Sequence, residues 1–149
     1  HSERRNLFGE SNDIIRQKVT NCIKARITPI VCVGEPWETR LNGAYKEFIL
    51  QQLIESLPNN QKFLNLIIGY EPIWSIGTGL IPSNEQLIEI FEIINSFLKQ
   101  SYVANNISLV YGGSVNLDNI KTILHLKNID GVLIGKASLD RTILLQMLG

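Results

Sequence analysis

Residues 66–94 read LIIGYEPIWSIGTGLIPSNEQLIEIFEII, and this stretch decides the fold class. The run 66–70 is apolar at consecutive positions and ends just before Pro72, which predicts a buried β-strand that stops there. Ser83 and Gln86 have the spacing of a capping box, and an apolar face of helical period follows them. That face comprises Leu87, Ile90, Phe91, Ile94 and Leu98. The stretch therefore predicts one strand–loop–helix unit.

The same unit recurs along the chain. Three more apolar runs end in glycine, at 29–34, 107–112 and 131–135, and helical periodicity lies before and between them. The expected helical faces comprise Ile14, Ile15, Val19, Cys22 and Ile23 in one segment and Tyr45, Phe48, Ile49, Gln52 and Leu53 in another. A further helix is expected to follow Asn116 and to end near Leu126. One helix followed by four strand–helix units predicts an α/β protein, with parallel strands covered on both faces and right-handed crossovers.

The number of strands leaves two architectures open. A chain of 149 residues is long enough for one domain with a real core. Four parallel strands suit a small doubly wound domain of the flavodoxin type. A complete (β/α)₈ barrel needs eight strands and about 250 residues. If the chain belongs to a barrel, residues 1–149 form only its last four strand–helix units and the helix before them.

Composition excludes several functional classes. The chain has 14 basic and 14 acidic side chains, so its formal net charge is zero, and 44% of its residues are hydrophobic. A neutral chain without a basic stripe is not expected to bind nucleic acid or an acidic membrane surface. No stretch approaches the ~18 consecutive apolar residues of a membrane span. We therefore expect local geometry, rather than overall charge, to hold any anion that this protein binds.

The cysteines and the amino end indicate a cytoplasmic location. Cys22 and Cys32 are too widely spaced to suggest a disulfide framework or a metal site. Residues 1–5 are charged and lack the apolar region of a signal peptide. Position 1 is not methionine, so we expect either a processed amino end or a piece of a longer protein.

Candidate functional residues follow the strands, where α/β proteins place their sites. Glu71 comes directly after the run 66–70, as either a catalytic acid or a solvated loop acid. Trp74 and Ile76 then alternate with flexible residues up to Gly79, as in a loop that closes over a ligand and excludes water. The alternative is an ordinary loop packed on the core.

Two further turns could bind an anion. Residues 111–115 and 134–139 each join a strand to a helix through small residues, which exposes backbone N–H groups at a helix amino end. Glycine also marks simple tight turns, so either turn alone is weak support. Together they have the layout of the phosphate site that the last two loops of many barrels form.

Several other side chains have two interpretations. His1 is either functional or a frayed end, and His125 is expected on a helix surface. Cys32 is expected to act as a small core residue, and Trp37 to anchor a helix start. Glu35 either supports the site or is a loop acid.

Five segments in this order resemble the triosephosphate isomerase family. They are His1-Ser2-Glu3-Arg4-Arg5, Cys32-Val33-Gly34-Glu35, the run from Tyr70 to Gly79, Tyr111-Gly112-Gly113-Ser114-Val115 and the turn Gly135–Leu139. The resemblance implies a (β/α)₈ barrel that interconverts dihydroxyacetone phosphate and D-glyceraldehyde 3-phosphate without a metal or an organic cofactor. It also implies a cytoplasmic homodimer.

The resemblance also implies roles for individual residues. Glu71 would be the base that removes a carbon-bound proton, and His1 would donate a hydrogen bond to the developing enediolate. The backbone at four positions would hold the substrate phosphate: Gly77, Ser114, Gly135 and Lys136. Segment 72–79 would be the lid, with Tyr111 steadying its closed form.

Departures from the family pattern leave a second hypothesis open. The first strands, the Asn-x-Lys motif and the third strand–helix loop of the family lie outside this chain. Lys136 and Leu80 stand where glycine and lysine are usual. A backbone contact at Lys136 tolerates a side chain if its φ is negative. The alternative to an enzyme is a non-catalytic half-barrel that binds phosphate or assembles with another chain through its open sheet edges, including a second copy.

Overall fold

A computed structural model describes residues 1–59, 63–102 and 104–149. Their secondary structure follows the predicted alternation of helices and strands, with two short 3-10 helices labelled η. In chain order the elements are α1 (Ser2–Phe8), α2 (Asn12–Lys24), β1 (Ile30–Val33), α3 (Trp37–Leu41), α4 (Tyr45–Ser56), β2 (Phe63–Tyr70), η1 (Ile73–Ser75), α5 (Asn84–Ser101), β3 (Ala104–Tyr111), α6 (Ile120–Leu124), β4 (Gly131–Val132), η2 (Lys136–Leu139) and α7 (Arg141–Leu148).

The order of the strands decides between the two architectures. The four strands form one parallel sheet in which β1, β2, β3 and β4 are neighbours in sequence order. A doubly wound sheet reverses its strand order at a switch point, whereas a barrel sheet keeps adding strands on one side. The flavodoxin-type alternative is therefore wrong, and the sheet is the singly wound kind that closes into barrels.

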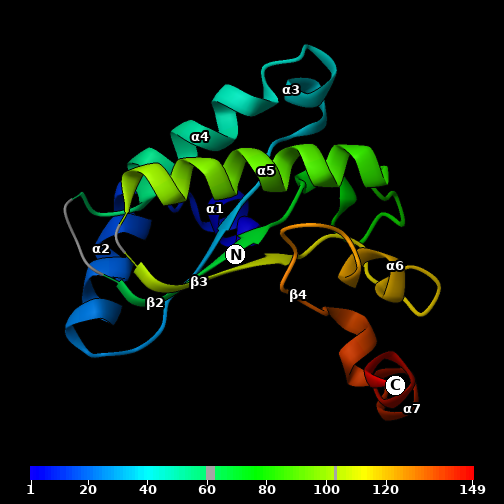
Figure 1. Cartoon of the computed structure of the whole chain (residues 1–149). Helices are drawn as coiled ribbons and strands as arrows, with labels where there is room; N and C mark the ends of the chain where they lie inside the picture. Colours follow the sequence, from blue (N-terminus) through cyan, green and yellow to red (C-terminus); the bar gives the residue numbers. More distant parts are fainter. Residues whose placement is uncertain (60–62, 103) are drawn as a thin grey trace.

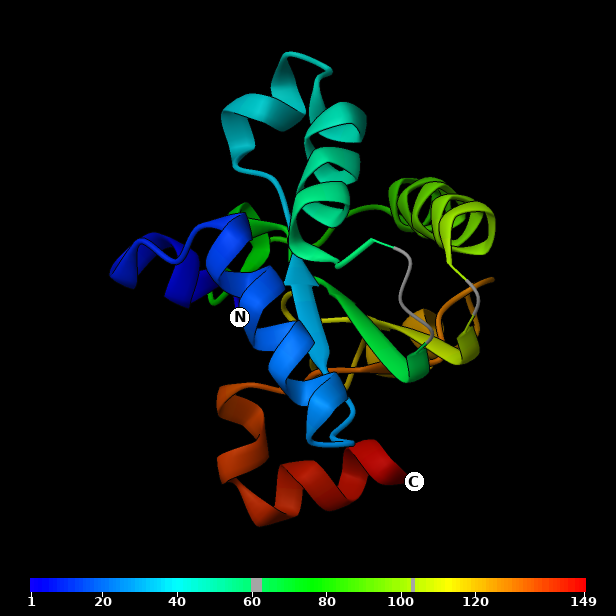
Figure 2. The ribbon, with the colours of Figure 1, turned by 90° about the vertical axis from the view of Figure 1, so that its left-hand side faces the viewer.

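Helices cover one face of this sheet. Figure 1 shows α4 and α5 lying across it, and α2 packs against α4. The predicted face of α5 is fully buried, and the capping box forms at Ser83. Viewed from the side in Figure 2, α7 lies at the far end of the molecule from α4 and α5. The core therefore sits between the sheet and the α4–α5 layer.

The expectation that the strands are covered on both faces is wrong for the face of the sheet that carries Ile30, Ile67 and Val110. Ile30 is 52% exposed, and Ile67 and Val110 are only half-buried. The opposite face of the sheet carries the α4–α5 layer, whereas on this face small side chains meet, such as Cys32 near Gly69. The pattern of consecutive apolar residues predicts burial on two faces of the sheet. In the described part of the chain, a layer of helices covers only one of them.

Two predicted helical faces are narrower than expected. In α2, Ile15 and Val19 are buried, while Ile14 is exposed and Cys22 and Ile23 are half-buried. In α4, Tyr45 and Phe48 of the predicted face are also only half-buried. The reason for α2 is its position, because it packs against α4, outside the sheet, and a narrow stripe suffices there.

Several element ends also differ from expectation. Strands β2 and β3 begin earlier than predicted, and near their starts the side-chain amide Nδ2 of Asn106 donates to Asn65 Oδ1 over 3.0 Å. β4 is shorter than predicted because it pairs only with β3 and the chain turns into η2 after 135. Asn116 does not start α6; it accepts hydrogen bonds from residues 118 and 119 in a turn, and Asn119 is the N-cap. The helix also ends two residues before Leu126.

No helix in the described part of the chain has the length and apolarity needed to cross a membrane.

Neighbouring residues of α4 test the assignment of the core. Leu53 is fully buried, whereas Ile54 is 53% exposed. We expect Leu53→Ala to lower the free energy of unfolding by about 2–5 kcal/mol, because it leaves a cavity in the core. Ile54→Ala is the matched control and is expected to change it by less than about 0.5 kcal/mol. Equal losses for the two variants in urea denaturation would contradict the assignment.

Candidate active site

Glu71 is held at the end of β2 by close backbone packing. Its N–H donates to the Val33 carbonyl over 2.8 Å, and its side chain is 1% exposed. A Cβ on Gly112 would lie 2.7 Å from Glu71 Cγ, and one on Gly34 would lie 1.8 Å from the Glu71 carbonyl oxygen. Both positions therefore require glycine because Glu71 occupies the space. The alternative of a solvated loop acid is wrong.

The amino end of α1 faces the Glu71 carboxylate. Ser2 N–H donates to Glu71 Oε2 over 2.8 Å, and His1 Nε2 lies 3.4 Å from Glu71 Oε1. His1 Nδ1 accepts a hydrogen bond from Glu3 N–H over 3.2 Å and so caps α1. In a neutral ring this assigns the single ring proton to Nε2, the atom that faces Glu71.

This arrangement joins two residues that are 70 positions apart in the sequence. His1 is exposed, yet its ring is positioned by the cap rather than frayed. A buried carboxylate beside an imidazole N–H can remove a proton from a bound molecule and polarise an oxygen next to it. Ser2 is also buried, whereas His1 is exposed, so the pair reaches the surface at His1.

A second buried carboxylate lies behind the site. Glu35 is fully buried, and its Oε1 accepts hydrogen bonds from Arg40 Nε over 2.8 Å, Tyr70 OH over 3.1 Å and Trp74 Nε1 over 3.1 Å. Burial, and then the nearby Glu35 carboxylate, raise the pKa of Tyr70 well above its ordinary value. Glu35 thus connects α3, the end of β2 and η1 through buried hydrogen bonds and is not a solvated loop acid.

The partners of Glu35 lie outside the sequence-based expectations. Arg40 is inside α3 and stacks over the Tyr45 ring at 3.9 Å, and Tyr70 ends β2. In the sequence, the pairing of Glu35 with Arg40 shows only as two opposite charges five residues apart. Such charges are equally common near the start of an exposed helix. The expected role of Trp37 is confirmed, because α3 begins at that residue.

Segment 72–79 has an anchored base and an exposed tip. Trp74 is tied to Glu35, and Thr78 Oγ1 donates to the Trp74 carbonyl over 2.9 Å. Gly77 and Gly79 lie at the exposed tip with φ of 67° and 81°, a backbone region that favours glycine. The loop is therefore not simply packed on the core: its base is anchored through Trp74, and residues 77–79 are exposed.

The four predicted phosphate-binding positions lie on two turns and the lid. Ser114 Oγ accepts from Gly79 N–H over 3.3 Å, so the turn after β3 touches the lid next to Gly77. Gly135 and Lys136 follow β4, the neighbour of β3 at the same sheet edge. No hydrogen bond of the described residues joins Gly135 or Lys136 to Ser114 or Gly77.

Lys136 fits its turn without backbone strain. Among the described non-glycine residues, only Arg26 and Asn128 have positive φ. Lys136 therefore has a negative φ, and the side chain that stands in place of the usual glycine does not strain the backbone of this turn. Its side chain is exposed.

The remaining candidates lie outside the site or behind it. His125 is exposed at the end of α6, where its Nδ1 contacts the Lys121 carbonyl at 2.6 Å. Cys32 is buried near Glu71, and burial, followed by that carboxylate, raises the pKa of its thiol to about 12. In the residues that the structure describes, no cluster of three or more His, Cys, Asp or Glu side chains is placed to hold a metal ion.

The fold and site together define an α/β chain of the barrel type, with a carboxylate–imidazole pair at the carboxyl edge of its parallel strands. The family model for triosephosphate isomerase matches residues 1–149. The chain belongs to the triosephosphate isomerase family.

Individual relatives agree with this assignment. Triosephosphate isomerase of Orientia tsutsugamushi (strain Boryong) is 48% identical over 143 residues, and that of Amoebophilus asiaticus is 44% identical over 144 residues. Each match covers 93% of this chain, and 56% and 57% of the respective relative. The chain thus spans little more than half the length of these relatives.

A solved structure confirms the fold class. The crystal structure of triosephosphate isomerase from Bartonella henselae superposes with a TM-score of 0.88 at 32% identity. The match covers 99% of this chain and 61% of that one. The predicted α/β barrel class is confirmed, with this chain corresponding to part of the barrel.

Substitutions at two glycines test how Glu71 is positioned. Gly112→Ala is expected to displace the Glu71 carboxylate and to cost about 1–3 kcal/mol of unfolding free energy through overpacking. The NMR signal of the Ser2 amide, which donates to that carboxylate, should shift. Gly135→Ala is the control, because nothing lies within 4 Å of its Cβ position. An unmoved Ser2 signal in Gly112→Ala would contradict the packing argument.

Alkylation rates test the state of Cys32. With its pKa raised to about 12, the thiol remains neutral at pH 8 and its thiolate forms only as the pH approaches 12. We expect iodoacetamide at pH 8 to label Cys32 at least about tenfold more slowly than half-buried Cys22. Peptide mass spectrometry measures both rates, and urea should make them similar. Equal labelling of the native protein would refute the assignment.

Proposed function

We propose that this chain carries the active site of a triose-phosphate isomerase, which interconverts dihydroxyacetone phosphate and D-glyceraldehyde 3-phosphate through an enediolate. The observation that carries the proposal is the buried Glu71 carboxylate, 3.4 Å from His1 Nε2 at the edge of the sheet. Family membership supports the same reaction. We propose further that residues 1–149 form the carboxyl-terminal part of a single barrel domain.

Glu71 is proposed to act as the base. One carboxylate oxygen is occupied by Ser2 N–H, which fixes the group, and the other faces His1. Burial removes water that would otherwise hydrate the carboxylate, so it is available to a carbon-bound proton next to a carbonyl. The abstracted proton is then returned to the neighbouring carbon, while the former hydroxyl oxygen loses its proton and the former carbonyl oxygen gains one. This converts ketose to aldose without net gain or loss of atoms.

His1 is proposed to stabilise the oxygen that becomes negative during this transfer. Its Nε2 carries the ring proton because Nδ1 is occupied by the Glu3 N–H. A donor aimed at a developing oxyanion is worth roughly 10²–10³ in rate. A neutral imidazole can donate this hydrogen bond and still carry its proton when the reaction ends.

The phosphate of the substrate is proposed to lie against the backbone of Gly77, Ser114, Gly135 and Lys136. Ser114 already contacts the lid through Gly79, and the turn after β4 lies at the same sheet edge. The backbone N–H groups of Gly77, Gly135 and Lys136 provide donors without requiring a net positive chain. The Ser114 N–H donates to Ser75 Oγ in this structure, so it would have to share its proton with the phosphate. Segment 72–79 would close over the bound molecule and exclude water.

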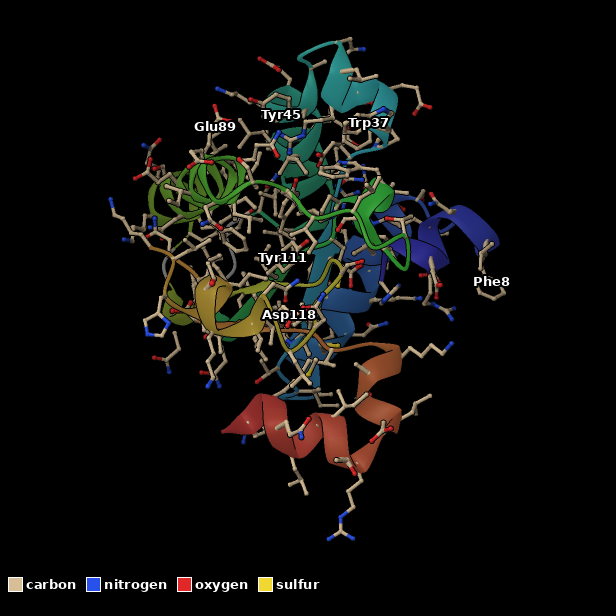
Figure 3. All side chains as sticks on the ribbon, turned by 90° about the vertical axis from the view of Figure 1, so that its right-hand side faces the viewer. Phe8, Trp37, Tyr45, Glu89, Tyr111 and Asp118 are labelled. Atoms are coloured by element: carbon tan, nitrogen blue, oxygen red, sulfur yellow. The ribbon has the colours of Figure 1, made fainter. Side chains whose placement is uncertain are left out.

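A homodimer working in the cytoplasm without a cofactor is also proposed, as the family resemblance implies. Leu7 and Phe8 at the end of α1 are largely exposed, and Figure 3 shows Phe8 projecting away from the body of the molecule. Two adjacent exposed apolar side chains are a feature of subunit contacts. Triose phosphates are the proposed substrates.

A complementation assay tests this function. The purified chain is mixed with the amino-terminal part of the Amoebophilus asiaticus relative that lies outside the matched 57%. We expect isomerisation in a coupled assay and a loss of about 10²–10⁴-fold in Glu71→Gln, which keeps the shape but removes the base. The control Glu47→Gln changes an exposed acid of α4 and should keep its activity.

The outcomes separate the two hypotheses. Turnover that is lost in Glu71→Gln supports the proposal. The same assay on the chain without the added amino-terminal part shows whether two copies of the chain can complete the site. No turnover in a complex that demonstrably assembles would refute it and favour the non-catalytic half-barrel.

A further inference from the structure

The base of the lid contains a buried hydroxyl that the proposed chemistry does not use. Ser75 ends η1 and is fully buried. Its Oγ lies within hydrogen-bonding distance of three groups: the Leu80 carbonyl at 2.5 Å, Tyr111 OH at 3.1 Å and Ser114 N at 3.2 Å. These partners belong to the far end of the lid and to the turn after β3.

The direction of each hydrogen bond follows from the chemistry of the partners. A carbonyl oxygen can only accept, so Ser75 donates its single proton to Leu80. The Ser114 N–H can only donate, so it occupies one lone pair of Ser75. Ser75 has no second proton, and Tyr111 must therefore donate to the remaining lone pair. All three hydrogen-bonding capacities of the hydroxyl are in use.

The surroundings leave little room for another arrangement. A Cβ on Gly113 would lie 2.1 Å from Tyr111 OH and 2.7 Å from Ser75 Oγ, so glycine at this position lets the two hydroxyls meet. Burial raises the pKa of Tyr111 to about 12, which keeps its phenol protonated and able to donate. Figure 3 shows Tyr111 in the interior of the molecule.

Ser114 reinforces the same connection. Its Oγ donates to the Ser75 carbonyl over 2.6 Å and accepts from Gly79 N–H over 3.3 Å. Ser75 within the lid, Gly79 at its end and Leu80 directly after it are thus tied to one turn. The exposed tip contains Gly77 and Thr78, and the Thr78 hydroxyl bonds with the Trp74 carbonyl and the Leu80 N–H rather than with the turn after β3.

We propose that Ser75 is a positioning residue for the lid, whose hydroxyl fastens both ends of segment 75–80 to the turn after β3. It touches no reacting atom and acts through Tyr111, Ser114 and Leu80. The inference rests on the proposed function in so far as it takes 72–79 to be the loop that closes over substrate. The hydrogen-bonded link itself is independent of that function.

Removing the hydroxyl should loosen the lid selectively. Ser75→Ala leaves the Tyr111 hydroxyl and the Ser114 N–H without their acceptor and frees the Leu80 carbonyl. We expect hydrogen exchange at the Ser114 amide and in segment 76–80 to accelerate about tenfold. Exchange in strand residues 66–70 should stay unchanged. This measurement uses the chain as it is and requires no activity.

A matched variant separates the lid from general destabilisation. Ser56 is also fully buried, and its hydroxyl bonds with Arg5 and Asn12, away from the lid. Ser56→Ala should not produce the selective acceleration. Tyr111→Phe should reproduce part of it, and Ser75→Ala with Tyr111→Phe should be no faster than Ser75→Ala alone, because the two hydroxyls share one bond.

A second measurement, on the complemented enzyme, connects the link to chemistry. An enediolate that escapes a loosened lid expels its phosphate through cleavage of the carbon–oxygen bond, so inorganic phosphate appears in place of the isomer. We expect Ser75→Ala to raise the ratio of phosphate released to isomer formed several-fold. That ratio is independent of the amount of folded enzyme, so a merely structural loss would not change it.

The outcomes distinguish this inference from the proposed function. Unchanged exchange in Ser75→Ala, or exchange that rises uniformly along the chain as in a general destabilisation, overturns the inference. Selective exchange in a complex without any isomerisation supports the link and refutes the proposed function. Selective exchange with an unchanged phosphate ratio in an active enzyme overturns the role in positioning the lid.

Discussion

The packing of the Glu71 carboxylate into the end of the sheet is the constraint on which the site depends. A buried carboxylate is costly unless its oxygens have partners, and here Ser2 N–H and the His1 ring face them. The same burial requires glycine at Gly34 and Gly112, because a side chain at either position would collide with Glu71. Strand ends, turn composition and the placement of α1 are thus consequences of one requirement.

The lid is connected to the scaffold at two separate places. Glu35 holds Trp74 through its carboxylate, and the Ser75 hydroxyl holds the neighbouring residue against the turn after β3. Both anchors are buried, whereas Gly77 is exposed and has positive φ. A loop built in this way moves at its tip while its ends keep their register with the strands, as closure over a small ligand requires.

Much of this arrangement could be predicted from the sequence where one physical rule acts alone. Helical period predicts the apolar face of α5, and the place of Glu71 after a buried strand makes it a candidate. The role of Glu71 as a base comes from the family resemblance and not from its position. The prediction was wrong for Ile14 and Ile30, because burial depends on which layer each element meets and not on its own pattern. Arg40 and Ser75 were missed because their roles exist only through residues distant in sequence, and neither residue type is informative by itself.

The most direct test of the central claim follows a proton rather than the product. The assembled enzyme is incubated with dihydroxyacetone phosphate in deuterium oxide, and NMR measures deuterium at the hydroxymethyl carbon. The account predicts incorporation at one of the two hydrogens of that carbon, lost in Glu71→Gln, since a single fixed carboxylate approaches from one side. Incorporation that persists in Glu71→Gln, or that affects both hydrogens equally, would contradict the assignment of Glu71 as the base.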